Sequence, residues 1–180
     1  MSTRTTLVRV LVVVLVAATV AVPATAATTV EPCATDRRFV NAWNKVFNQH
    51  VRITARQTQL LGQIFTLLAA NEKIPREVVT ELQTLITKQR QLIASGLRTL
   101  TRTKVGTANG VVFKRLVLRY LRVVARPLNN CIAKLLVADS PSELQAVIGC
   151  VDSTERARVS LQRSLDSALE KMAVRRSKCA

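Results

Sequence analysis

The 180-residue chain contains few helix-breaking residues and few aromatic residues. It has only five glycines and five prolines, and one of these residues lies near every place where the apolar pattern is interrupted. Alternation of apolar and polar residues, which is typical of strands, is absent over useful lengths. Long amphipathic helices with short connections are therefore expected, and the sequence predicts an all-α fold.

The chain also lacks the residue patterns of common enzymes. A hydrolytic nucleophile needs a neighbouring base, usually histidine, and the one histidine, His50, lies in the apolar register of a predicted helix. The segment from Gly106 to Gly110 has too few glycines, and no Gly-Lys-Ser/Thr ending, to bind a nucleotide phosphate. No cysteine pair has the close spacing of a metal site. We therefore predict a non-enzymatic protein with no catalytic residues, no metal site and no cofactor.

Acidic residues are missing between Leu82 and Ala138, although this segment carries eleven Lys or Arg residues. Four arginines recur at steps of four, three and four residues, which places them on one stripe of a helix. A neighbouring lysine lies beside this stripe, and three further basic residues extend the basic surface across the preceding loop. This surface is either a contact for a polyanion or an acidic protein, or a solvated face that keeps a basic protein soluble. The predicted binding residues are Arg115, Arg119, Arg122, Arg126, Lys114, Arg98, Arg102 and Lys104.

Residues 1–26 have the three parts of a secretory signal peptide. Two arginines precede the apolar run from Val10 to Val22, and Ala24-Thr25-Ala26 forms a small-residue cleavage site. The apolar run is shorter than the ~20 residues that a membrane span needs, so no stable membrane anchor is predicted. Cleavage would remove two arginines and no acid, and the formal charge of +16 would become +14. We expect a secreted, extracellular protein in which residues 27–180 form one helical domain.

Four long helical segments are predicted in this domain. The first runs from about Asp36, a candidate N-cap, to about Ala70, and its buried stripe holds most of the aromatic residues. The second begins at Pro75 and ends near Lys104, and residues 105–110 form a loop.

The third segment runs from about Val111 to Val137, with a kink at Pro127 because proline removes a backbone hydrogen bond. The fourth begins at Ser140-Pro141-Ser142-Glu143, which combines an N-cap, a first-turn proline and a capping-box glutamate. A second helix-start signal follows at Asp152-Ser153-Thr154-Glu155, so a bend at that point stays open.

Four cysteines in an exported chain indicate two disulfides. In an antiparallel, up-down four-helix bundle, Cys33 and Cys179 lie at the same end. Cys131, near the end of the third helix, and Cys150, near the start of the fourth, lie at matching depths. The predicted pairs are therefore Cys33–Cys179 and Cys131–Cys150.

Several anionic partners suit a basic face of this kind, including sulfated glycosaminoglycans, anionic lipids and acidic proteins. Nucleic acid is not expected, because the few aromatics belong to the core and are not interleaved with the basic residues. A membrane-active, antimicrobial role is less favoured, because the core already occupies the apolar face of a bundle helix. A carrier that encloses a small apolar ligand in a cavity of several hundred Å3 is the alternative from a different class.

The stretch Phe39-Val40-Asn41-Ala42-Trp43-Asn44-Lys45-Val46-Phe47-Asn48-Gln49-His50, together with a signal peptide and a basic helical domain with four cysteines, resembles the anopheline mosquito salivary proteins of the anophensin and albicin type. The resemblance implies secretion in saliva into vertebrate blood. It also implies inhibition of the alternative complement pathway or of the kallikrein-kinin contact system, by binding a host plasma protein or protease complex without cleaving it. We expect a monomer that acts in this way.

Overall fold

The computed structural model describes residues 33–70, 72–138 and 140–174, and within these ranges the chain forms only helices and their connections. The predicted all-α fold is thus confirmed for this part of the chain. The predicted signal peptide and Cys179 lie outside the described residues.

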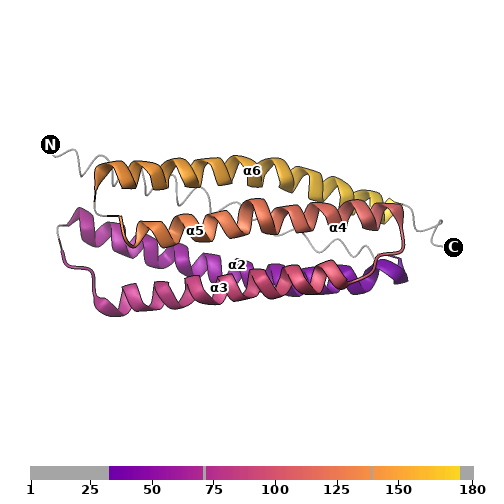
Figure 1. The fold of residues 1–180 in the computed structure, drawn as a ribbon, viewed down its shortest axis with the longest axis horizontal. Helices are drawn as coiled ribbons and strands as arrows, with labels where there is room; N and C mark the ends of the chain where they lie inside the picture. The colour runs from indigo at the N-terminus through magenta and orange to yellow at the C-terminus, as the bar shows by residue number, and fades with distance from the viewer. Residues whose placement is uncertain (1–32, 71, 139, 175–180) are drawn as a thin grey trace.

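The helices form four rods that pack on one another. Consecutive rods run in opposite directions (Figure 1). The first two rods are α2 (Ala34–Ala69) and α3 (Arg76–Arg102). The third comprises α4 (Ala108–Tyr120), the π-helical turn η1 (Leu121–Ala125) and α5 (Arg126–Leu135), and we call it the α4–α5 rod. The fourth is α6 (Pro141–Val174), which packs along the whole α4–α5 rod.

Two hydrophobic clusters fill the interior, and a layer of polar side chains separates them. One cluster is rich in aromatics and includes Phe39, Trp43 and Phe113, whereas the other is mainly aliphatic and includes Leu61 and Leu82. On each rod a buried polar residue falls between the members of the two clusters. These residues are His50 and Gln57 on α2, Gln89 on α3, Asn129 on α5 and Thr154 on α6. The prediction that the aromatic residues and His50 belong to the core is confirmed.

The connection between α3 and α4 differs from the prediction. Residues 108–110 belong to α4, because the side chain of Thr107 caps this helix by accepting a hydrogen bond from the Gly110 N–H at 2.9 Å. Asp36 is not an N-cap: α2 begins two residues earlier, and the Asp36 side chain is 1% exposed. Its carboxylate accepts hydrogen bonds from the backbone N–H of Gly106 at 2.7 Å, and from the N–H and hydroxyl of Thr107. Asp36 therefore fixes the start of α4 rather than that of its own helix.

Pro127 changes the hydrogen-bond pattern of the third rod. The rod contains one π-helical turn that ends two residues before the proline, and the Arg126 N–H bonds to the carbonyl of Leu121, five residues earlier. A proline cannot donate a backbone hydrogen bond and crowds the preceding turn, so the additional residue per turn accommodates it. The predicted irregularity therefore takes the form of a π turn, and α5 ends at Leu135, two residues before the predicted end.

The start of α6 matches the predicted capping box. The Glu143 N–H donates to the Ser140 hydroxyl at 3.3 Å, and the Ser140 N–H donates to the Glu143 carboxylate at 3.2 Å. The helix then continues through Asp152 to Val174 without a break, so the second start signal is not used. The predicted disulfide between Cys131 and Cys150 is confirmed, with a Cα–Cα distance of 5.9 Å.

Candidate functional site

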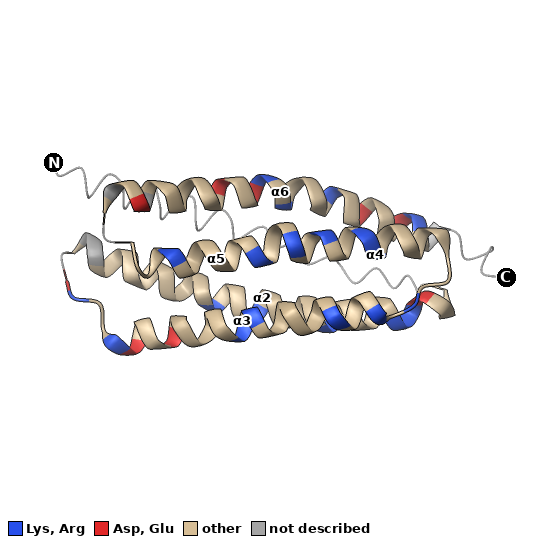
Figure 2. Cartoon of the chain, in the orientation of Figure 1, with Lys and Arg blue, Asp and Glu red and all other residues tan. Residues whose placement is uncertain are grey.

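The four predicted arginines Arg115, Arg119, Arg122 and Arg126 are all exposed on the α4–α5 rod. None of them forms an ion pair with another described residue, whereas Arg56 pairs with Glu81 and Arg158 pairs with Glu155. Figure 2 shows a row of basic positions along this rod with no acidic position among them, whereas both signs occur along α6. The arginines are therefore available to an external anion.

The inner side of the α4–α5 rod holds the arginines in place. Phe113, Val117, Leu121 and Val124 are almost completely buried against the aromatic cluster. Because these residues alternate with the arginines at helical spacing, the rod cannot rotate without exposing its apolar side. The row is thus presented on a rigid helix, which lowers the conformational entropy that binding costs.

Lys114 has a different role from the one predicted. Its ammonium group donates to the backbone carbonyl oxygens of Thr101 at 2.8 Å and Thr103 at 2.6 Å. These carbonyls lie at the C-terminal end of α3, where a positive charge is favourable because of the helix dipole. The ammonium also lies 5.9 Å from the centre of the Phe39 ring. Lys114 therefore joins α3 to α4 and contributes less to an external contact than the four arginines.

The remaining predicted residues lie on or after α3. Arg98 and Arg102 are exposed and line a surface depression of about 470 Å3 together with Ser95, Thr99 and Thr103. Lys104 is exposed in the loop that follows. Because α3 packs against the α4–α5 rod, the basic residues predicted on α3 and the four arginines predicted on the α4–α5 rod lie on adjoining rods.

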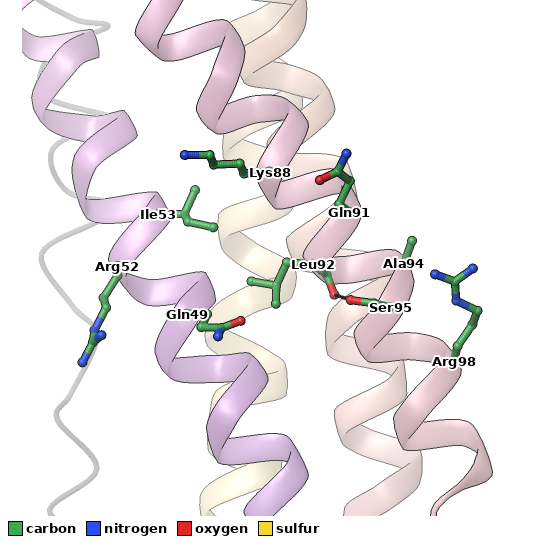
Figure 3. Close-up of a pocket in the computed structure, with 9 residues that line it drawn as sticks. All are labelled: Gln49, Arg52, Ile53, Lys88, Gln91, Leu92, Ala94, Ser95 and Arg98. Atoms are coloured by element: carbon green, nitrogen blue, oxygen red, sulfur yellow. Dashed lines mark hydrogen bonds between the residues drawn. The ribbon is translucent and has the colours of Figure 1, made fainter.

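A surface groove of about 650 Å3 between α2 and α3 adds two cations that the sequence prediction omitted. Arg52 and Lys88 line it together with Arg98, and no acidic residue does so. Figure 3 shows that Ile53 and Leu92 project into the space between the two helices, while the Arg52 guanidinium points away from it. Lys88 lies in the acid-free segment, so its charge was visible in the sequence. Its position beside α2 was not, because it depends on the packing of the two helices.

The polar layer is buried inside the protein and is not part of the basic face. The Gln89 side-chain amide donates to His50 Nδ1 at 3.0 Å, so the His50 Nε2–H is directed to the Tyr120 hydroxyl at 3.3 Å. Burial lowers the pKa of His50 to about 4, and burial also raises the pKa of Tyr120 to about 12. Both groups are neutral at neutral pH, which suits an interior role. No group of three or more His, Cys, Asp or Glu residues able to hold a metal occurs in the described ranges.

Exposed valines, which were not among the predicted binding residues, accompany the arginines on the α4–α5 rod. Val111, Val112 and Val123 are 45%, 48% and 41% exposed, and they are three of the five large apolar residues identified as exposed in the described part of the chain. The signal was available in the sequence, because Val112, Arg115, Arg119 and Val123 follow one another at steps of three, four and four.

Among the described helices, none has an apolar stretch long enough to cross a membrane. Comparisons of the chain with protein-family models, with curated proteins and with solved structures each give no match. Function is therefore inferred from the residues and their arrangement.

Proposed function

We propose that this is a secreted, non-enzymatic binding protein that inhibits the host complement system or the kallikrein-kinin contact system. The basic face of the α4–α5 rod contacts an acidic host plasma protein, a protease complex or a polyanionic surface such as a sulfated glycosaminoglycan. The exposure of four arginines without an ion-pair partner in the described ranges supports this contact most directly. The choice of host pathway rests on the resemblance to the anopheline salivary proteins.

We further propose that the four rods form an antiparallel four-helix bundle with two disulfides. Cys33, directly before α2, is disulfide-bonded. Since Cys131 and Cys150 bond to each other and the chain has four cysteines, we propose Cys179 as the partner of Cys33. This second bridge would join the two ends of the mature chain and stabilise it in blood.

Plasma assays with a charge-reversal variant test the proposed function. The test variant carries Glu in place of Arg115, Arg119, Arg122 and Arg126. The control variant carries the same number of reversals at exposed positions on α2 and α6, namely Arg38→Glu, Lys45→Glu, Arg163→Glu and Lys171→Glu. Both variants change the net charge equally, so a difference between them reports the location of the charge.

We expect the mature oxidised protein to inhibit alternative-pathway haemolysis or surface-triggered contact activation. The test variant should lose at least roughly tenfold in potency, and the control variant should stay within about twofold of wild type. Equal potency of the test variant and wild type would exclude the α4–α5 rod as the contact surface.

The groove between α2 and α3 supports one second candidate, a carrier of a small amphiphilic anion. Its volume of about 650 Å3 lies within the range of ligand sites, and its lining combines Ile53 and Leu92 with basic residues, although the Arg52 guanidinium points away from the groove. The groove is on the surface, however, and not in the core, where a carrier cavity was predicted. Organic extraction of the native protein followed by mass spectrometry should recover a bound lipid if this candidate is correct, and binding should survive reversal of the four arginines.

A further inference from the structure

The valines among the arginines indicate what kind of partner the basic face fits. Val112, Arg115, Arg119 and Val123 form one ridge on the α4–α5 rod, which we call the mixed ridge, with two half-exposed valines flanking two exposed arginines. Val111 lies one turn before Arg115 on the same side. This ridge is apolar as well as basic, which the charge pattern alone did not show.

Helix stability and solubility do not account for these valines. A β-branched residue is a weaker helix former than Ala, Lys, Gln or Glu, and at exposed positions packing gives no compensation. Single exposed apolar residues are common on protein surfaces, but three within the first sixteen residues of one rod, beside exposed arginines, form a cluster. An exclusively polyanionic ligand would gain nothing from them, because it offers no apolar surface to cover.

The basic residues of the ridge are also arginines rather than lysines. A guanidinium group can bind a carboxylate bidentately and is more weakly hydrated than an ammonium group, so it tolerates partial burial beside an apolar side chain. Arginine is enriched in the buried centres of protein–protein interfaces, where lysine is depleted. Lys114, the one lysine beside the stripe, is engaged with the carbonyls at the end of α3.

We propose that the mixed ridge docks on a folded protein whose surface has carboxylates around an apolar centre, rather than on a sulfated polysaccharide or a lipid headgroup surface. This inference rests on the proposed function and selects among its partners. The valines contact the apolar centre, and the arginines bind the surrounding carboxylates. The neutral contact makes part of the affinity insensitive to salt, because only the charged contacts release counterions.

The test uses Val112→Thr combined with Val123→Thr, which keeps the β-branched shape and adds a hydroxyl to each side chain. The control combines Val137→Thr and Val159→Thr, two exposed valines that lie outside the mixed ridge. Each variant is measured in the plasma inhibition assay, in binding to immobilised heparin, and in binding to vesicles of phosphatidylserine and phosphatidylcholine. Circular dichroism and thermal unfolding verify that both variants fold.

We expect the ridge variant to lose roughly tenfold in inhibitory potency, because two half-exposed valines no longer contribute apolar burial. Its heparin binding should equal that of wild type, and the control should be unchanged in all three assays. A ridge variant with full potency, alongside an arginine variant that has lost it, would overturn the protein-docking inference and leave a purely anionic partner.

Other outcomes separate the inference from the proposed function. A parallel loss of vesicle binding and potency in the ridge variant would assign the ridge to a membrane surface and overturn the inference. Full potency of both the ridge variant and the arginine variant would exclude the rod as the contact, and the proposed function of this face would fail with it. No inhibition by the wild-type protein would remove the proposed function and this inference together.

Discussion

The α4–α5 rod has an outer and an inner face, and the two faces differ in the polar groups they carry. The outer face keeps four full charges in water without an ion-pair partner in the described ranges. The inner face buries only neutral polar groups, Tyr120 and Asn129, and joins them to His50 and Gln57. Exposed charges cost little in stability, whereas a buried charge costs far more than a buried neutral polar group, and a buried neutral polar group still needs a hydrogen-bond partner. Substitutions on the outer face should therefore change binding, and those on the inner face should change stability.

Removal of the Cys131–Cys150 bridge should have the largest effect on stability, and it is the first test of the comparison between the two faces. Replacement of both cysteines by Ala releases a loop with a sequence separation of 19. The free energy of unfolding should fall by about 3 kcal/mol, because the unfolded chain gains conformational freedom. Urea unfolding measures the loss. Heparin affinity at 20 °C should be unchanged, and a matching loss of affinity would show that the two faces are coupled.

A change of pH should affect the inner face through His50. Its pKa falls from 6.5 in the unfolded chain to about 4 in the folded protein, because burial disfavours the imidazolium. The unfolded chain therefore binds more protons between these values, so stability is complete above about pH 6.5 and decreases as the pH falls towards 4. The total decrease is about 3 kcal/mol, of which about 2 kcal/mol appears by pH 5.

Thermal unfolding at pH 7, 6 and 5 measures this effect, and His50→Gln provides the control because the chain has no other histidine. The variant should be less stable at pH 7 but much less sensitive to pH across this window. An equally steep pH dependence in the variant would mean that another group titrates.

Asp36→Ala tests how firmly the start of the rod is fixed. The substitution leaves the Gly106 N–H and the Thr107 N–H and hydroxyl without their acceptor, and it should cost about 2 kcal/mol of unfolding free energy. The position is closely packed, since a Cβ added to Gly110 would lie 2.6 Å from the Asp36 carboxyl carbon. Hydrogen exchange should show faster opening of residues 106–110, with little change in η1 and α5. Uniformly faster exchange along the rod would instead indicate that α4 and α5 open together.

The sequence predicted the helices and the inner disulfide because both depend on regular spacing. The positions of Cys131 and Cys150 followed from helix length and antiparallel order, and the start of α6 followed from one local motif. The contacts of Asp36 and Lys114 could not be predicted in this way. Asp36 reaches a loop 70 residues away, and Lys114 reaches the end of the preceding helix. Both contacts depend on how complete helices pack.

The polar layer and the mixed ridge were partly visible in the sequence. Gln89 lies three residues after Ile86 and four before Ile93, so its spacing places it on the buried stripe of α3. The valines of the ridge likewise share the spacing of the arginines. The sequence does not show that these valines are exposed to solvent. A valine at helical spacing is predicted to be a core residue until the packing of the neighbouring rods is known.

The most direct test of the outer face is the binding of the oxidised mature protein to immobilised heparin across a salt series. Wild type, the four-arginine reversal on the rod and the charge-matched control on α2 and α6 are compared. If the anion contact lies on the rod, the control variant retains heparin binding and the rod variant binds more weakly. The plot of log K against log salt concentration should also be less steep for the rod variant than for wild type, by about four in slope. Equal loss in both variants would show that only net charge matters, and would contradict the assignment of the contact to the α4–α5 rod.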